Sequence, residues 1–250
     1  MKAIALVLAL TCTAALAPTA ARQGTPAERA FDPKAVKALA QIGTKLRGLR
    51  EYTVSAELQT RAPLASGEYR DFRGNVRYQV RTPDRLHASI RGIGFDRDVV
   101  FDGRTIAVFS PAQNTYARIE APGTLATMVS EVEQRTGLAI PIAQLFHWDD
   151  QARLLEGAER ATYSGQALVG GRDCAHYSYK KAGVAWEVFA DAQHLPCKLA
   201  FVDTRDPNLP GYSAELTWDE RARVPDAAFV FEPPAGANEI AWDRFKAQGQ

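Results

Sequence analysis

Alternating apolar and polar residues between positions 98 and 119 predict antiparallel strands joined by tight turns. The dipeptide Asp102-Gly103 between apolar runs is a strong hairpin signal, because two-residue turns need positive φ angles that Asp and Gly tolerate. We therefore expect Phe101 to lie opposite Arg104. Paired residues share a face of the sheet, so one apolar face is expected to carry Val99, Phe101, Ile106, Val108, Ala117 and Ile119. The other face is mixed, and other parts of the chain must cover the apolar one.

The same alternation continues on both sides of these strands. A turn at 110–115 is expected to place Phe109 opposite Tyr116. Earlier in the chain, strands are predicted at 52–58, 72–80 and 86–90; later strands are predicted at 159–163, 167–169, 173–180, 184–190, 198–204, 213–218 and 229–234. The fold class is mainly β (α+β), with ten or eleven strands that are antiparallel throughout. A sheet of that length must curl or close, which predicts a curved half-barrel.

Three segments show helical spacing instead. Asp32-Pro33 indicates a helix start, and its apolar stripe is Val36, Leu39, Ile42, Leu46 and Leu49. Thr124 is expected to cap a second helix, with apolar positions Leu125, Met128, Val129 and Val132. Ile140-Pro141 is expected to open a short third helix that carries Ile142, Leu145 and Phe146. No second sheet is evident in the sequence, so we expect these helices to cover the concave apolar face.

The N-terminus resembles a secretory signal peptide over residues 1–21, with one lysine, an apolar run and small residues. A lipid anchor at Cys12 is not expected, because the preceding apolar run is short and Thr11 is large for such a site. Residues 22–30 are expected to be a flexible leader, 31–242 a single domain and 243–250 a C-terminal tail. No later stretch approaches the roughly 20 apolar residues of a membrane-spanning helix. The expected product is periplasmic and not an integral membrane protein.

Charge excludes one class of partner. The chain has 30 Lys and Arg against 29 Asp and Glu, and loss of Lys2 with the signal peptide leaves it neutral. A neutral chain argues against nucleic acid as a partner. A row of basic residues consists of Arg70, Arg73, Arg77, Arg81 and Arg85. Acidic residues are interleaved with it, so we interpret this row as a solvated outer face.

The exported chain keeps two cysteines, Cys174 and Cys197. An oxidising compartment favours a disulfide between them. The predicted strand 184–190 lies between them in the chain, however, and two strand spacings of about 9.6 Å exceed the reach of a disulfide. The bridge therefore requires one cysteine at a strand end, which Cys197 after Pro196 could be.

Catalytic motifs are missing from the sequence. It contains no GxSxG, HExxH, CxxC or phosphate-binding loop, and we expect no metal and no cofactor. His147 stands beside Asp149 and Asp150, but no second His or Cys stands at ligand spacing. We interpret this run as a helix end leading into a polar loop. The chain is expected not to be an enzyme, and a hydrolase dependent on His147 is the remote alternative.

The order of parts resembles a family of predicted periplasmic proteins of unknown function, which is grouped with the LolA-like and LolB-like lipoprotein carriers. The segments that carry the resemblance are FDGRTIAVFSPAQNTYARIEAPGT, IPIAQLF, DCAHYSY, VAWEVFADAQHLPCKLAF and FVFEPPAGANEI, within residues 31–240. The resemblance implies an incomplete curved barrel whose concave face, lidded by helices, holds acyl chains. No arginine can be placed by motif on the carriers' functional arginine.

We therefore expect a periplasmic protein that holds a lipid, a lipoprotein acyl chain or another hydrophobic molecule in a groove. The alternative is a regulatory, envelope-sensing module on the same fold, with an envelope protein as partner and exposed aromatics such as Phe109 and Tyr116 in the contact. The expected groove residues are Phe72, Val76, Tyr78, Val99, Phe101, Ile106, Val108, Ile119, Met128, Val132 and Trp186.

Overall fold

The computed structural model describes residues 30–64, 66–92, 96–136, 140–146, 148 and 154–247. The strands are β1 (Glu51–Pro63), β2 (Tyr69–Arg81), β3 (Arg85–Arg91), β4 (Arg97–Phe101), β5 (Thr105–Ser110), β6 (Thr115–Glu120), β7 (Ala158–Val169), β8 (Arg172–Lys181), β9 (Val184–Ala190), β10 (Pro196–Asp203), β11 (Gly211–Asp219) and β12 (Asn238–Glu239). The helices are α1 (Pro33–Gly48), α2 (Leu125–Thr136) and α4 (Trp242–Ala247), with 3-10 turns η1 (Ala143–Phe146) and η2 (Asp226–Phe229).

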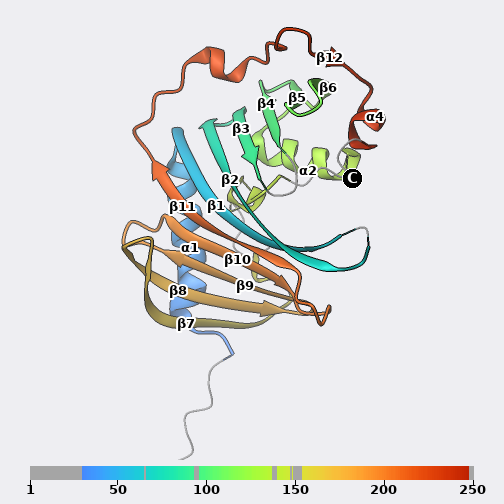
Figure 1. Ribbon diagram of the computed structural model, residues 1–250. Coiled ribbons are helices and arrows are strands. Elements are labelled where there is room, and N and C mark those ends of the chain that lie inside the picture. Colours follow the sequence, from blue (N-terminus) through green and yellow to red (C-terminus); the bar gives the residue numbers. More distant parts are fainter. Residues whose placement is uncertain are drawn as a thin grey trace, which may run out of the picture.

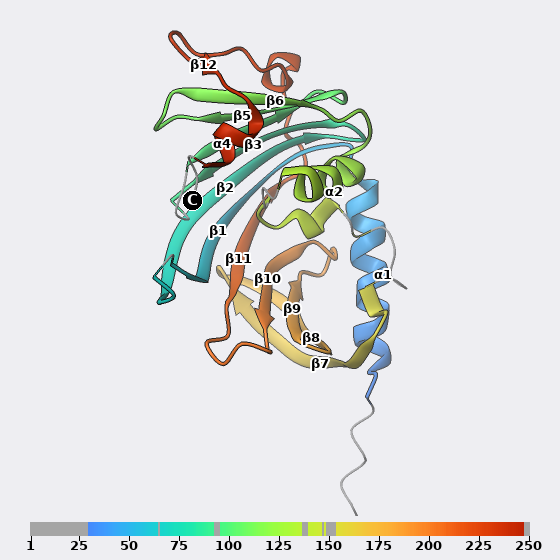
Figure 2. The same ribbon diagram turned by 90° about the vertical axis from the view of Figure 1, so that its right-hand side faces the viewer.

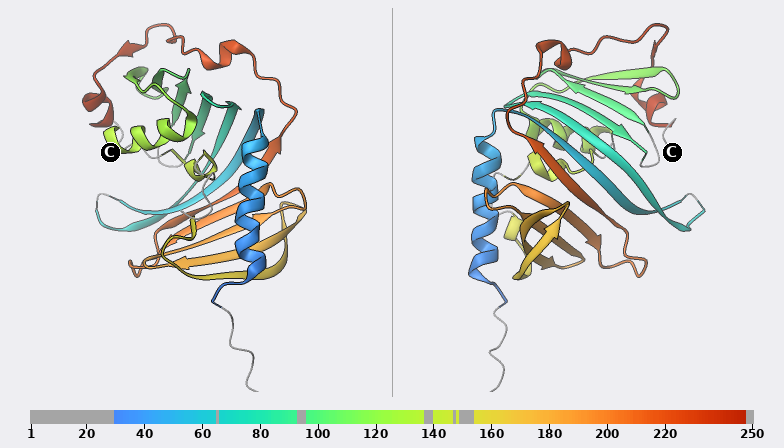
Figure 3. Two further views of the ribbon diagram at one scale, coloured as in Figure 1. Left: turned by 180° about the vertical axis from the view of Figure 1, so that it is seen from behind. Right: turned by 60° about the vertical axis from the view of Figure 1, so that its left-hand side comes forward.

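All of these strands belong to one curved, open sheet with the order β12-β6-β5-β4-β3-β2-β1-β11-β10-β9-β8-β7 (Figure 1). Seen from the side, β6 to β1 arch over the top and β11 to β7 return below (Figure 2). The helices α1 and α2 lie inside this curve, and α1 crosses the lower strands (Figure 3). The expected half-barrel with helices on its concave face is confirmed, with twelve strands rather than ten or eleven.

The concave face carries the apolar residues that the alternation predicts. On β1, Tyr52, Val54 and Leu58 are buried, and on β3 Leu86 and Ile90 are buried. The same core cluster takes in residues of α1 and α2, so one core lies between the sheet and its helices. The run of residues 159–169, predicted as two strands, is a single strand with a register shift between Tyr163 and Gly165.

The first hairpin differs from the predicted register. Phe101 pairs with Ile106 and not with Arg104, because the turn is centred on Gly103 and Arg104. Asp102 precedes the turn, and its carboxylate accepts hydrogen bonds from the backbone N–H groups of Arg104 at 2.9 Å and Thr105 at 2.7 Å. Gly103 then takes the position that requires a positive φ, here 88°. The partner shifts by two residues, so every side chain keeps its predicted face.

The second hairpin and the helix starts agree with the sequence. Phe109 pairs with Tyr116 as expected. Asp32 caps α1 by accepting the backbone N–H of Lys34 at 2.8 Å, and Pro33 is the first helical residue. The predicted stripe of α1 is buried except Val36, which is only partly buried.

The C-terminal strap, which we define as residues 224–241, corrects two expectations. Residues 229–234 form no strand; η2 ends at Phe229, and the strap then crosses the convex face with the ring of Phe231 on Phe109 and Tyr116, at centroid distances of 6.2 and 5.2 Å. Both aromatics are therefore buried, at 9% and 8% exposed, and not exposed as expected. The two-residue β12 pairs in parallel with β6, so the sheet is not antiparallel throughout. Beyond the strap, α4 buries Phe245.

Cys174 and Cys197 form a disulfide with a Cα–Cα distance of 6.6 Å. The strand between them, β9, ends at Ala190, which pairs with Pro196. The register of β10 shifts between Pro196 and Lys198, so Cys197 lies in the irregularity where β9 ends. The bridge therefore passes the end of the intervening strand, as the sequence required.

Removal of this disulfide should destabilise the lower half of the sheet. The bond closes a loop of 23 residues, and a loop of that size contributes about 3 kcal/mol by limiting the unfolded chain. We expect the double variant Cys174→Ala/Cys197→Ala to unfold at correspondingly lower urea, and reductant to shift the wild type, but not the variant, by the same amount. Equal midpoints for all samples would contradict a structural bond.

Candidate functional site

The helices fill the concave face at the expected groove residues. Nine of the eleven are buried in one cluster, namely Val76, Tyr78, Val99, Phe101, Ile106, Val108, Met128, Val132 and Trp186. Phe72 and Ile119 are only partly buried and lie outside that cluster. The sequence thus selects one face of the sheet correctly, and in this structure the chain's own side chains occupy it.

The centre of the concave face is covered by residues 140–146 and 148, here called the cover segment. The Tyr78 hydroxyl donates a hydrogen bond to the carbonyl oxygen of Pro141, and the ring of Phe146 meets the ring of Tyr78 edge-on at 5.5 Å. The Tyr212 hydroxyl donates to Oε1 of Gln144 at 2.6 Å. Two tyrosines from β2 and β11 therefore hold the cover segment at two points.

Trp148 seats the end of the cover segment between α1 and the sheet. Its ring is 3% exposed and meets Trp186 edge-on at 6.3 Å. A Cβ atom at Gly43 would lie 2.6 Å from the carbonyl oxygen of Trp148, so only glycine permits this approach to α1. Arg47 donates to the same carbonyl at 3.4 Å.

Aromatic rings form a ladder across the lower half of the concave face. Its members are directly paired residues of β8, β9, β10 and β11: Tyr179, Trp186, Phe201 and Tyr212. Their consecutive centroid distances are 3.9, 6.0 and 5.3 Å, and all three pairs are stacked. The hydroxyl of Tyr179 also donates to the carbonyl oxygen of Ala35 at 2.8 Å, which fixes α1 to the sheet.

The tyrosines of this face stay neutral. Burial raises the pKa values of Tyr52, Tyr78 and Tyr179 above their ordinary value. These three groups therefore add no charge to the face, and the hydroxyls of Tyr78 and Tyr179 act as hydrogen-bond donors.

An opening of about 330 Å³ lies where α1, α2 and the cover segment meet, and we call it the mouth pocket. Its apolar wall consists of Leu46, Tyr52, Leu125, Leu145, Phe146 and Trp148, and Arg47 and Arg50 also line it. The sequence predicted most of these apolar residues as core or lid. It did not indicate the opening, because that depends on how three distant segments meet.

One buried arginine was also missed by the sequence analysis. Arg97 on β4 is 6% exposed, donates to the Ser110 hydroxyl at 2.9 Å and lies over the ring of Phe245, 5.2 Å from its centroid. Burial lowers its pKa. Its partners are spread over β5 and α4, so no local motif reveals it.

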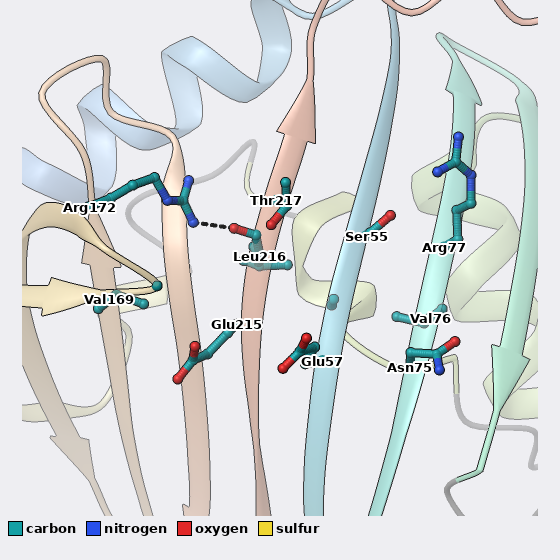
Figure 4. A pocket seen from close by; sticks show the side chains of 12 residues that line it. Ser55, Glu57, Asn75, Val76, Arg77, Val169, Arg172, Glu215, Leu216 and Thr217 are labelled. Carbon is teal, nitrogen blue, oxygen red and sulfur yellow. Dashed lines mark hydrogen bonds between the residues drawn. The ribbon is translucent and has the colours of Figure 1, made fainter.

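A second cavity of about 510 Å³ lies on the convex face, under the β7–β8 turn (Figure 4). Glu57 and Glu215 lie opposite each other on β1 and β11 and point into it, and Arg172 donates to the carbonyl oxygen of Leu216. Lys198 lies 3.4 Å from Glu215. These charged walls do not suit a hydrocarbon ligand.

The described residues bring no catalytic set together. No group of three or more His, Cys, Asp or Glu side chains among them could hold a metal ion. His176 stacks on Phe189 at 4.1 Å on the convex face. His147, Asp149 and Asp150 lie outside the described residues. Within the described part of the chain, the helices are also too short or too polar to cross a membrane.

The cover segment should loosen when its tyrosine anchor is removed. Tyr78→Phe deletes one hydrogen bond, worth about 1 kcal/mol, so amide exchange in residues 140–146 should accelerate about fivefold. Tyr179→Phe is the matched control, because its hydroxyl holds α1 instead and its loss should leave those amides unchanged. Hydrogen exchange measured by mass spectrometry checks this. Equal exchange in both variants would contradict the anchoring role.

Three solved structures resemble the chain at low identity. A chain of the Pseudomonas aeruginosa MucA/MucB complex aligns with TM-score 0.46 and 15% identity, covering 79% of this chain and 61% of that one. The Mycobacterium tuberculosis lipoprotein LppX aligns with TM-score 0.48 and 14% identity, covering 78% and 100%. A conserved protein from Thermus thermophilus aligns with TM-score 0.48 and 9% identity, covering 83% of this chain and 99% of that one. The chain thus spans about three fifths of its match in the MucA/MucB complex.

No curated protein matches the sequence. A family described as "Predicted periplasmic protein (DUF2092)" matches residues 35–242. This match extends over most of the chain and confirms the resemblance to a family of predicted periplasmic proteins. The chain therefore belongs to the DUF2092 family of periplasmic proteins.

Proposed function

We propose that this protein binds a lipid, a lipoprotein acyl chain or another elongated hydrophobic molecule against the concave face of its sheet. The observation that carries the proposal is the cover of that face. Among the described residues, the apolar face is covered by α1, α2 and a cover segment attached through a few side chains, and not by a second sheet. A second sheet would make the face a permanent core, whereas a segment can be displaced by a guest.

Displacement would exchange similar contacts. The cover segment buries Ile142, Leu145 and Trp148 against the sheet, and an acyl chain offers the same kind of surface. The hydrogen bonds given up include those of the hydroxyls of Tyr78 and Tyr212 and that of Arg47 to the carbonyl oxygen of Trp148, and these donors can bind water once the segment leaves. The free-energy difference between the closed and loaded states is therefore small compared with the free energy gained by burying the whole apolar face.

The mouth pocket is the proposed entry. It lies where the cover segment meets α1 and α2, and its wall is apolar at Leu125 and Leu145. Arg47 and Arg50 line the same pocket and are exposed, so an acyl chain could enter with an anionic head group beside them. The proposal includes no catalysis.

Filling the mouth pocket should block uptake without unfolding the protein. Ala126 lines the pocket and is partly exposed, so Ala126→Trp should reduce binding of a fluorescent fatty acid at least tenfold. Ser130→Trp, one turn further along α2 and outside the pocket lining, is the matched control and should bind like the wild type. Fluorescence titration measures the affinity, and thermal unfolding checks that both variants fold.

Native mass spectrometry of protein purified from the periplasm, followed by lipid extraction, tests the proposal independently. A co-purified lipid supports it. Empty protein with no affinity for fatty acids, phospholipids or acylated peptides overturns it. Binding of acylated peptide alone would favour the alternative of an envelope-sensing module whose partner supplies the chain.

A further inference from the structure

Positive charge is concentrated on α1. The helix contains Lys34, Lys37, Lys45 and Arg47 but no Asp or Glu. Arg50, which is exposed, follows shortly after the end of the helix. The chain as a whole carries nearly equal numbers of acidic and basic residues, so the rest of it has an excess of acids. Charge is therefore segregated onto this helix and not spread evenly over the surface.

The lysines at the start of α1 do not serve the stability of the helix. The backbone dipole gives the N-terminus of a helix a partial positive charge, so a cation in the first turn is unfavourable. Lys34 lies in the first turn, which contains no acidic residue, and its ammonium gains only a contact over the ring of Tyr163, 4.8 Å from the centroid. Among the described residues, none forms an ion pair with Lys37. The positive charge at this end of α1 therefore needs another explanation.

At the other end of α1 the cations border the mouth pocket. Arg47 and Arg50 line that pocket. Lys45 is balanced by an ion pair with Glu220 and contributes less to the surface charge. The 16 residues of the helix extend over about 24 Å at 1.5 Å per residue. Positive charge thus extends from the mouth pocket along the length of α1.

This side of α1 is open to a large partner. Figures 2 and 3 show α1 at the outside of the molecule. Leu39 and Ile42 are buried, whereas Lys34 and Lys37 are exposed. Phe31, just before the helix, is 41% exposed. Basic residues bind anionic lipid head groups, and aromatic rings favour the interface between membrane and water, so this combination suits a membrane surface.

We propose that α1 docks this protein on an anionic lipid bilayer and thereby places the mouth pocket beside the membrane. The docking itself needs only the charges of α1. Its purpose, which is to let a lipid pass between the bilayer and the concave face, rests on the proposed function. A few exposed cations give a weak contact that salt screens, so the protein binds the membrane reversibly.

Co-sedimentation of the full chain with vesicles tests the docking. The probes are vesicles of phosphatidylcholine alone and vesicles of phosphatidylcholine and phosphatidylglycerol in equal parts. We expect binding only to the second kind, and release as the Debye length falls from about 10 Å at 0.1 M salt to about 3 Å at 1 M. Each cation near an anionic surface is worth about fivefold in affinity, so Lys34→Gln/Lys37→Gln should weaken binding about 25-fold.

The matched control is Arg73→Gln/Arg77→Gln, which removes the same charge from exposed positions on the convex face of β2 and should bind like the wild type. The melting temperature of Lys34→Gln/Lys37→Gln should stay unchanged or rise, because cations leave the positive end of the helix. Uptake of a fluorescent fatty acid in solution should also match the wild type, since neither lysine lines the mouth pocket.

A polarity-sensitive dye tests the orientation. Attached at Ala126→Cys in the mouth pocket, it should report a less polar environment on anionic vesicles, whereas a dye at Asn75→Cys on the convex face should not. A response at Asn75 alone overturns the proposal. Equal binding to both kinds of vesicle, unchanged binding in Lys34→Gln/Lys37→Gln, or an equal loss in Arg73→Gln/Arg77→Gln also overturns it. Vesicle binding without affinity for fatty acids would support the docking and contradict the proposed function, so the two fail separately.

Discussion

Burial of one apolar sheet face is the requirement on which this structure depends. The twelve strands form one open sheet, and within the described residues no second sheet faces it. The concave face must therefore be covered by segments outside the strands, which are α1, α2 and the cover segment. The convex face meets the same requirement locally, where the C-terminal strap places Phe231 on two aromatic residues. The helices, the cover segment and the C-terminal strap thus each cover part of one face of the sheet.

The elements that cover the concave face differ in how they are attached to it. α1 is capped at its start, bound by the Tyr179 hydroxyl and packed through a continuous stripe. The lower strands beneath it are crosslinked by the disulfide and by Arg172. The cover segment has only short turns of its own and is held by the side chains of other elements. A helix with many attachments and a segment with few therefore lie side by side over the same face.

Much of the fold could be predicted because strand faces depend on local alternation. The residues of the first hairpin point to the predicted sides of the sheet even though their partners differ from the prediction. Asp102 accepts hydrogen bonds from the backbone N–H groups of the turn, so the turn lies one residue later than predicted and Phe101 still points to the concave side. The predicted strand at 229–234 is absent because the two prolines that follow Phe231 cannot donate hydrogen bonds to a neighbouring strand. The ring of Phe231 instead packs on Phe109 and Tyr116 across the convex face. The sequence assigned the expected groove residues to the apolar face of the sheet. How closely other segments cover that face depends on contacts such as that of Trp148 with Gly43, which no local sequence pattern encodes.

The strand order has a consequence for how the sheet is covered. Strands β6 and β7 follow each other among the strands of the chain, yet β7 is one edge of the curved sheet and β6 lies next to the other edge strand, β12. The described parts of the connection between them, α2 and the cover segment, lie over the concave face. The part of the chain that covers the concave face is thus also the part that links the two sides of the sheet.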